Sequence, residues 1–155
     1  MLLTILFVNI RLVAQTPNSL GSLDAYIGLP NLTVGMNLKD VKGKLIPVQS
    51  KTKSDNSGRV YYNYVSREAF FSDENIHVKS VQVKAFQDTI EEVEITFSKF
   101  DDIKIFQKFR EQYGMFTDKP NLYQDIYYWA GNTVKLMYNY SDNAGNPTAK
   151  FGVNL

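Results

Sequence analysis

The chain has 155 residues, with 17 Lys and Arg against 16 Asp and Glu, so its formal net charge at pH 7 is +1. It contains no cysteine, which excludes disulfide frameworks, thiolate metal sites, cysteine nucleophiles and a lipid-modified N-terminal cysteine. The single histidine, His77, excludes metal sites built on two histidines.

Residues 1–15, MLLTILFVNIRLVAQ, predict a secretory signal peptide. The apolar run over 2–10 is too short to cross a bilayer, which needs about 20 apolar residues. We therefore expect export to the periplasm or the medium, with no stable membrane anchor. No Lys or Arg precedes the run, which a start site placed too late would explain. The alternative is that 2–14 form a core strand or a short buried helix.

The remaining residues, 16–155, have the size of one domain, which we expect to be α+β. The similar turn sequences SDNSG at 54–58 and SDNAG at 141–145 leave another division open. In that division the chain forms two helix-plus-hairpin units, at about 23–97 and 98–155.

Two short elements are predicted first. Residues 23–27 indicate a strand, which Gly28 ends. Residues 36–45 indicate a helix, which Asn37 can cap and Gly43 weakens. Its apolar residues share one helical face: Leu38, Val41 and Leu45.

Residues 46–97 have mostly strand signals. We expect strands at about 47–53, 60–65, 76–86 and 90–97, with a turn at 54–58 and another at Gln87-Asp88. The third strand changes phase between Val78 and Val81, which suggests a bulge. In the fourth, strict alternation predicts an inner face of Val93, Ile95 and Phe97 and an outer face of Glu92, Glu94 and Thr96.

Charge is distributed unevenly over the same region. Residues 36–67 hold seven Lys or Arg and two Asp, whereas 68–102 hold nine Asp or Glu and three Lys. We expect neighbouring strands with mutually attractive exposed faces; a basic patch for an anionic partner is the alternative. Because no Arg-rich cluster or basic strip interleaved with aromatics is present, we expect no nucleic-acid partner.

A longer helix is predicted over 98–113. Ser98 can cap it, Asp101 at the third helical position nearly completes a capping box, and Gly114 can end it. The helical period places one set of residues on its inner face: Ile103, Phe106, Phe109 or Arg110, and Tyr113.

The last forty residues predict an aromatic hairpin, with strands 124–130 and 133–140 joined by Gly131-Asn132, and a final strand near 148–153. The two-residue turn places Trp129 opposite Val134. One face is then apolar and inward: Tyr127, Trp129, Val134, Leu136, Tyr138 and Tyr140. The other is mixed: Ile126, Tyr128, Lys135, Met137 and Asn139. A three-residue turn would send Trp129 outward.

Few residue patterns indicate catalysis. His77 has no supporting serine motif, and Glu92 and Glu94 occupy the polar face of a strand. No calcium-loop or phosphate-loop pattern occurs. We therefore predict no catalytic residues, no metal site and no cofactor. A buried carboxylate pair beside His77 would be evidence for an enzyme.

The motifs at 35–41 (GMNLKDV) and 129–131 (WAG) resemble those of small exported envelope proteins. The order of elements is similar to the layout of the SmpA-type outer-membrane-assembly lipoproteins and the β-lactamase inhibitor proteins. The resemblance implies helices on one face of an antiparallel sheet and binding to another protein.

The fold prediction is therefore α+β, an antiparallel sheet of about six to eight strands with two helices packed on one face. The predicted function is that of an exported non-enzymatic protein that binds another protein or an envelope component. Tyr128, Lys135 and Met137 are the predicted binding residues. The first alternative is a small-ligand or carbohydrate binder that uses exposed aromatics of the hairpin, and the second is an enzyme of unknown class.

Overall fold

The computed structural model describes residues 21–48, 58–66, 68–119, 125–140 and 145–154. The predicted signal peptide, 1–15, and residues 54–57 of the turn predicted at 54–58 lie outside the described residues. The helical elements are α1 (Gly21–Ala25), η1 (Leu38–Asp40), η2 (Phe70–Ser72) and α2 (Asp102–Tyr113). The strands are β1 (Lys44–Pro47), β2 (Arg59–Val65), β3 (Val78–Phe86), β4 (Thr89–Phe97), β5 (Ile126–Ala130), β6 (Val134–Asn139) and β7 (Thr148–Val153).

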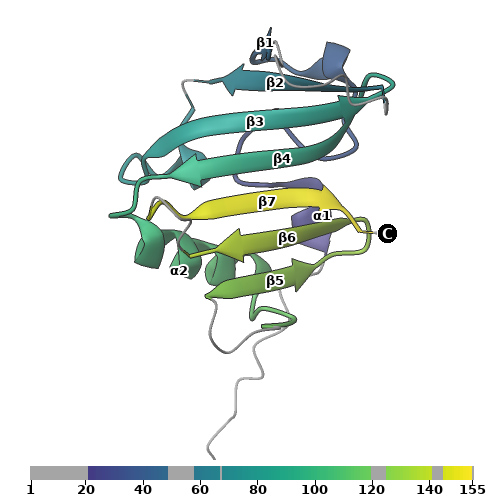
Figure 1. Ribbon diagram of the computed structural model, residues 1–155. Helices are drawn as coiled ribbons and strands as arrows, with labels where there is room; N and C mark the ends of the chain where they lie inside the picture. Colours follow the sequence, from purple (N-terminus) through teal and green to yellow (C-terminus); the bar gives the residue numbers. More distant parts are fainter. Residues whose placement is uncertain (1–20, 49–57, 67, 120–124, 141–144, 155) are drawn as a thin grey trace, which may run out of the picture.

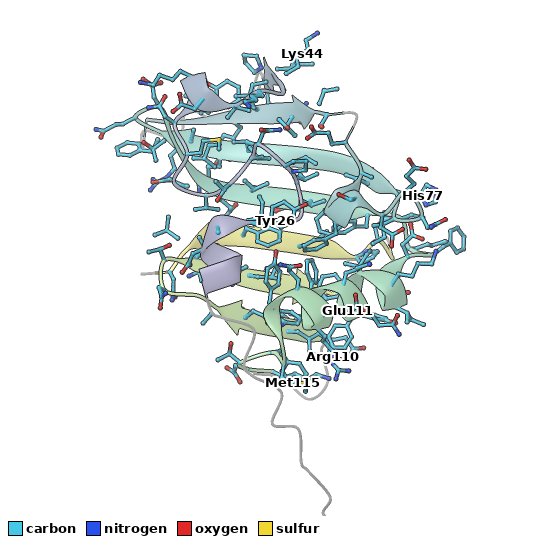
Figure 2. The ribbon with its side chains drawn as sticks, turned by 180° about the vertical axis from the view of Figure 1, so that it is seen from behind. Tyr26, Lys44, His77, Arg110, Glu111 and Met115 are labelled. Carbon is cyan, nitrogen blue, oxygen red and sulfur yellow. The ribbon has the colours of Figure 1, made fainter. Side chains whose placement is uncertain are left out.

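The predicted antiparallel sheet is confirmed. Its seven strands are ordered β1-β2-β3-β4-β7-β6-β5, so β7 lies between the β3–β4 and β5–β6 hairpins (Figure 1). Both α-helices lie on one side of this sheet (Figures 1 and 2), and of the two only α2 is longer than five residues. We refer to the opposite side of the sheet as the outer face.

The strand predictions for the middle of the chain are confirmed. The structure contains β2, β3 and β4 at the expected places, and the β3–β4 register shifts between Val78 and Ser80, where the bulge was predicted. Val93, Ile95 and Phe97 are buried, as their alternation predicts. The strand predicted at 47–53 is instead β1, which begins at Lys44, and the residues after 48 are outside the described range.

The two earliest predictions are wrong. A strand was predicted at 23–27, but residues 23–25 belong to helix α1. Leu23 and Ile27 are buried in the core. The helix predicted at 36–45 is the single 3₁₀ turn η1 followed by β1. Asn37 does cap that turn, accepting a hydrogen bond from the Lys39 N–H at 3.1 Å. Pairing of β1 with β2 competes with the helix, and the Tyr64 ring packs onto Gly43, where a Cβ would collide with it.

Helix α2 is present, but it begins at Asp102, so its N-cap residue is Asp101 and not the predicted Ser98. The Asp101 side chain forms no cap bond within the helix because its carboxylate binds His77. Gly114 ends the helix with a positive φ of 82°, as predicted. The buried side chains are Ile105, Phe109 and Tyr113, whereas Ile103 is 61% exposed, so the predicted inner face was wrong at its first residue.

An aromatic core fills the space between α2 and the sheet. Phe109 is fully buried, with its ring centroid 5.2 Å from Tyr138 and 5.7 Å from Trp129. Phe70 joins this cluster from η2, with its centroid 4.8 Å from Phe97. The contacts of Phe109 with Tyr138 and of Phe70 with Phe97 are edge-to-face, and such contacts stabilise the core beyond simple area burial. These contacts hold α2 against one side of the sheet, so α2 does not cover the outer face.

The β5–β6 hairpin has the predicted faces but not the predicted register. Trp129 pairs with Leu136 instead of Val134. The turn is centred on Asn132-Thr133, because the Gly131 N–H donates to the Val134 carbonyl at 2.8 Å. The register therefore shifts by two residues, which keeps every side chain on its face of the sheet. Trp129 is buried as expected, at 2% exposure.

Candidate functional site

The outer face is built from rows of side chains that run across the strands. Pairing places Lys84 opposite Glu92, Glu92 opposite Gly152, and Gly152 opposite Lys135. The adjacent row contains Gln82, Glu94, Lys150, Met137 and Tyr128 in the same order of strands. Residues between these positions, such as Val83, Val93 and Phe151, are buried on the helix side. Alternation therefore directs both rows away from the core.

All three predicted binding residues lie on this face. Tyr128 on β5 is directly opposite Met137 on β6, and Met137 is opposite Lys150 on β7. Lys135 lies two residues from Met137 on the same strand and is exposed, while Tyr128 and Met137 are half-buried. The structure thus brings the three residues together on the outer face.

The backbone at Tyr128 is not free to pair with another strand. Its carbonyl accepts the Thr117 N–H at 2.6 Å, and its N–H donates to the Asp118 carbonyl at 3.0 Å. The segment after α2 therefore covers this part of the sheet edge. A partner at Tyr128 would contact its side chain.

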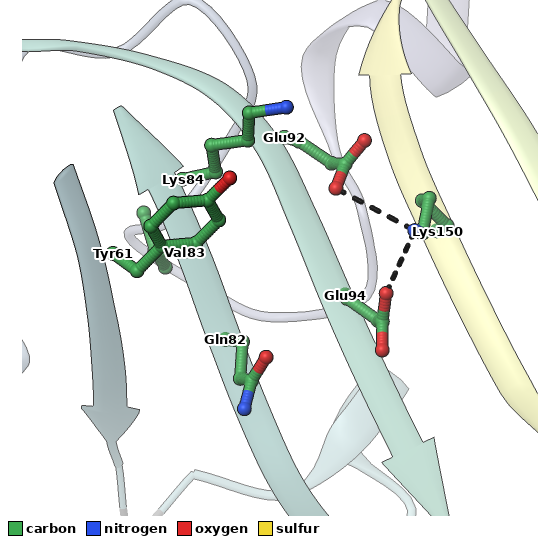
Figure 3. Close-up of a pocket in the computed structure, with 7 residues that line it drawn as sticks. All are labelled: Tyr61, Gln82, Val83, Lys84, Glu92, Glu94 and Lys150. Carbon is green, nitrogen blue, oxygen red and sulfur yellow. Dashed lines mark ion pairs between the residues drawn. The ribbon is translucent and has the colours of Figure 1, made fainter. Parts of the chain in front are cut away.

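Lys150 is the centre of the charged part of the outer face. Its Nζ lies 2.9 Å from a Glu94 carboxylate oxygen and 3.6 Å from one of Glu92 (Figure 3). Burial alone would lower the pKa of Lys150, but the bond to Glu94 and the two negative charges outweigh it and raise that pKa. Lys150 therefore stays protonated at neutral pH, which suits an ion-pairing role and not that of a nucleophile.

A depression of about 330 Å³ lies over β2, β3, β4 and β7 beside Lys150 (Figure 3). Its lining is mostly polar and charged: Tyr61, Gln82, Val83, Lys84, Glu92, Glu94 and Lys150. The sequence predicted the outward direction of Glu92 and Glu94 but missed Lys150 as their partner. That pairing depends on β7 lying beside β4, for which the sequence has no local signal.

Another depression, of about 460 Å³, lies at the C-terminal end of α2. All of its lining residues belong to the single stretch 107–115, and Arg110, Glu111 and Met115 lie at or just beyond the C-terminal end of the helix (Figure 2). Binding sites draw polar groups from several elements. The outer face meets that condition and this depression does not.

One observation bears on the enzyme alternative. Asp101 is 3% exposed, and its carboxylate accepts the His77 backbone N–H at 2.9 Å and contacts His77 Nδ1 at 3.0 Å. Burial would raise the pKa of Asp101, but the bonds from His77 lower it. A buried carboxylate pair beside His77 would have been evidence for an enzyme. Asp101 is the only buried carboxylate among the described residues, so they contain no such pair.

The arrangement around His77 has a structural explanation. The imidazole is exposed at the end of the sheet beside the start of α2 (Figure 2), and Asp101 ties the two elements together. Within the described part of the chain, no group of three or more His, Cys, Asp or Glu side chains could hold a metal ion.

The uneven charge along the sequence has a counterpart in the sheet. Arg59, from the basic segment, forms a 2.7 Å ion pair with Glu91, from the acidic segment. The two residues lie on β2 and in the bulged part of β4, on either side of β3. The pair joins the basic and acidic segments across β3, whereas the expectation was for attraction between neighbouring strands.

No helix in the described residues is long and apolar enough to cross a membrane. No family model, no curated protein and no solved structure matches the chain.

Proposed function

We propose that this chain is an exported, non-enzymatic protein that docks another protein, or a component of the cell envelope, on its outer face. The observation that carries the proposal is the juxtaposition of Tyr128, Met137 and Lys150 in one row, with Lys135 beside them. An aromatic ring, a methionine and two cations on a sheet face that no described helix covers form a mixed surface of the kind found at protein interfaces.

The geometry supports a docking surface better than a carbohydrate site. Carbohydrate binding by the hairpin would need exposed rings, but Trp129 is buried and its Nε1 donates to the Gly114 carbonyl at 3.0 Å. Tyr127 also faces the core, and its ring centroid lies 4.6 Å from that of Phe106. The outer-face tyrosines, Tyr61 and Tyr128, lie on β2 and β5, with four strands between them. These two tyrosines are therefore too far apart to contact one small ligand together.

Export is the other half of the proposal and depends on residues 1–15. It is supported by the apolar run and by the absence of cysteine from the sequence. The layout of the SmpA-type lipoproteins and β-lactamase inhibitor proteins is a parallel for a sheet with helices on one side and a free face on the other. Fractionation of cells that express the protein from its native upstream sequence, with a C-terminal tag, tests this half. Cytosolic protein of full-length mass would contradict it.

The docking half is tested by affinity capture from envelope extract with three versions of residues 16–155. These are the wild type, Tyr128→Ala with Met137→Ala, and the control Ile103→Ala with Met115→Ala. The control truncates two apolar side chains that are 61% and 64% exposed at or near α2. We expect specific proteins to be captured by the wild type and the control and lost from the outer-face variant. Equal capture by all three, at equal thermal stability, would show that the outer face is not the docking surface.

A further inference from the structure

Two lysines on the outer face have no carboxylate partner in the described part of the chain. Lys84 on β3 and Lys135 on β6 form no ion pair, although Lys84 lies opposite Glu92 in the register. Glu92 contacts Lys150 instead (Figure 3). The acidic groups of β4 are thus engaged by Lys150, while the charges of Lys84 and Lys135 remain available to a partner.

The two lysines occupy one row of the sheet, with Glu92 and Gly152 between them. Three strand spacings separate β3 from β6, so the Cα atoms of Lys84 and Lys135 are about 14 Å apart. An extended chain advances about 3.4 Å per residue, so residues i and i+4 are also about 14 Å apart and point to the same side. A strand-like segment laid across the sheet could therefore place one carboxylate on each lysine.

The middle of the row favours a different kind of residue. Glu92 and Glu94 outnumber Lys150 there, so a third acidic side chain would be repelled. Gly152 adds no charge to the middle of the row. We therefore place a neutral or basic side chain at i+2 of the partner segment.

The half of the face formed by β5, β6 and β7 adds a second argument. Its outward positions, as the register defines them, include two lysines and no acidic residue: Ile126, Tyr128, Ala130, Lys135, Met137, Asn139, Thr148, Lys150 and Gly152. An acidic segment that reaches Lys135 therefore meets no like charge there and gains contact with Met137 and Tyr128.

We propose that the docking partner contributes an extended acidic segment that crosses β3, β4, β7 and β6, with carboxylates at i and i+4 bound to Lys84 and Lys135. This inference rests on the proposed docking function and specifies the chemistry of the partner. An anionic membrane surface could also attract the lysines, but it offers no fixed spacing of charges.

The test uses fluorescein-labelled synthetic peptides of glycine and serine and residues 16–155 of the protein. The probe has two glutamates four positions apart, with glutamine midway. One control has glutamates three positions apart, which in an extended chain point to opposite sides. Another replaces both glutamates by glutamine. Fluorescence anisotropy at low ionic strength should show binding of the probe and at most weak binding of either control.

Protein variants assign the contacts. Lys84→Gln with Lys135→Gln should weaken probe binding about tenfold, since each exposed pair contributes modestly. Lys39→Gln with Lys42→Gln removes two exposed lysines outside the seven strands and should leave binding unchanged. Thermal unfolding checks that each variant is folded.

Several outcomes would overturn the inference. They are absence of probe binding to the wild type, equal binding of the four- and three-spaced peptides, and equal loss in both lysine variants. Binding to phosphatidylglycerol vesicles without binding to the probe would overturn it in favour of a membrane surface. If the partner captured from extract is lost with Tyr128→Ala and Met137→Ala but retained by the Lys84/Lys135 variant, the docking function stands and the acidic segment does not.

Discussion

Asp24 and Gly131 are in such close contact that a Cβ on residue 131 would lie 2.5 Å from an Asp24 carboxylate oxygen. The same carboxylate accepts the backbone N–H groups of Asn132, Thr133 and Val134 at 2.8–2.9 Å. A side chain in α1 thus holds the β5–β6 turn in place, and the glycine is needed for its close approach.

Replacement of Asp24 by Ala should destabilise the protein by about 2–3 kcal/mol, because three N–H groups lose a charged acceptor. Chemical denaturation measures the loss, and amide hydrogen exchange should show it first at residues 132–134. Asp24→Asn keeps one oxygen acceptor and should lose less. If Asp24→Ala is as stable as the wild type, the carboxylate does not hold the turn.

Replacement of Gly131 by Ala should cost about 1–3 kcal/mol through overpacking, because the new Cβ would meet the Asp24 carboxylate and the Val134 carbonyl. The effect should be smaller in an Asp24→Ala background, where the carboxylate is gone and only the contact with the Val134 carbonyl, at 2.9 Å, remains. Gly152→Ala is a matched control, since it adds a Cβ to a strand residue without a close contact. Equal denaturation midpoints for the Gly131 and Gly152 variants would contradict the prediction.

Stability should fall on acidification because of Asp101. Its hydrogen bonds from His77 make its pKa lower in the folded chain than its ordinary value. The folded state then binds the proton less tightly than the unfolded state, so the contribution is complete above the ordinary carboxyl pKa and is lost from about pH 5 downward. The titratable groups in contact with it are His77 and Lys104.

Denaturation of the wild type and Asp101→Asn at a series of pH values checks this. The wild type should be more stable at pH 7, and the difference should shrink as the pH falls. Glu74→Gln is the control, because the Glu74 carboxylate forms no ion pair among the described residues. A difference between the wild type and Asp101→Asn that stays constant down to the lowest pH would assign the effect to packing instead of ionisation.

Trp129 is the only tryptophan of the chain and reports on the hairpin directly. Because it is 2% exposed, its native fluorescence should be blue-shifted and poorly quenched by acrylamide. Trp129→Phe leaves the Gly114 carbonyl without its donor and should cost about 1–3 kcal/mol. Quenching as strong in the native as in the unfolded protein would contradict the burial of the ring.

Elements with a regular local pattern were predicted from the sequence, whereas elements that depend on contacts between distant residues were not. Helix α2, the three strands β2 to β4 and the two faces of the hairpin have regular periods, and these were predicted. The α1 helix has five residues, too few for a period, and is held by Asp24, whose contacts are with residues 132–134. The helix predicted at 36–45 failed for a similar reason, because the Tyr64 ring that packs onto Gly43 comes from a residue distant in the sequence.

The candidate site was likewise predicted only in part from the sequence. Tyr128, Lys135 and Met137 were placed correctly on one face because the error in register was two residues. The ion pairs of Lys150 with Glu92 and Glu94 could not be predicted, since they require the strand order as well as the strands. Periodicity determines which way a side chain points, and it does not determine which strand lies beside it.

The place of β7 between β4 and β6 also has a consequence for the order of assembly. During synthesis, β1 to β4 and β5 to β6 can each pair through local turns, but the two groups are held in one sheet by the strand that follows them all in sequence. Until β7 has been made, β4 and β6 present unpaired inner edges, which are prone to aggregation. The proposed docking surface spans this junction, so it cannot form on a nascent chain that lacks β7. A chain that folds only after translocation across a membrane would reach its binding-competent state on the far side of that membrane.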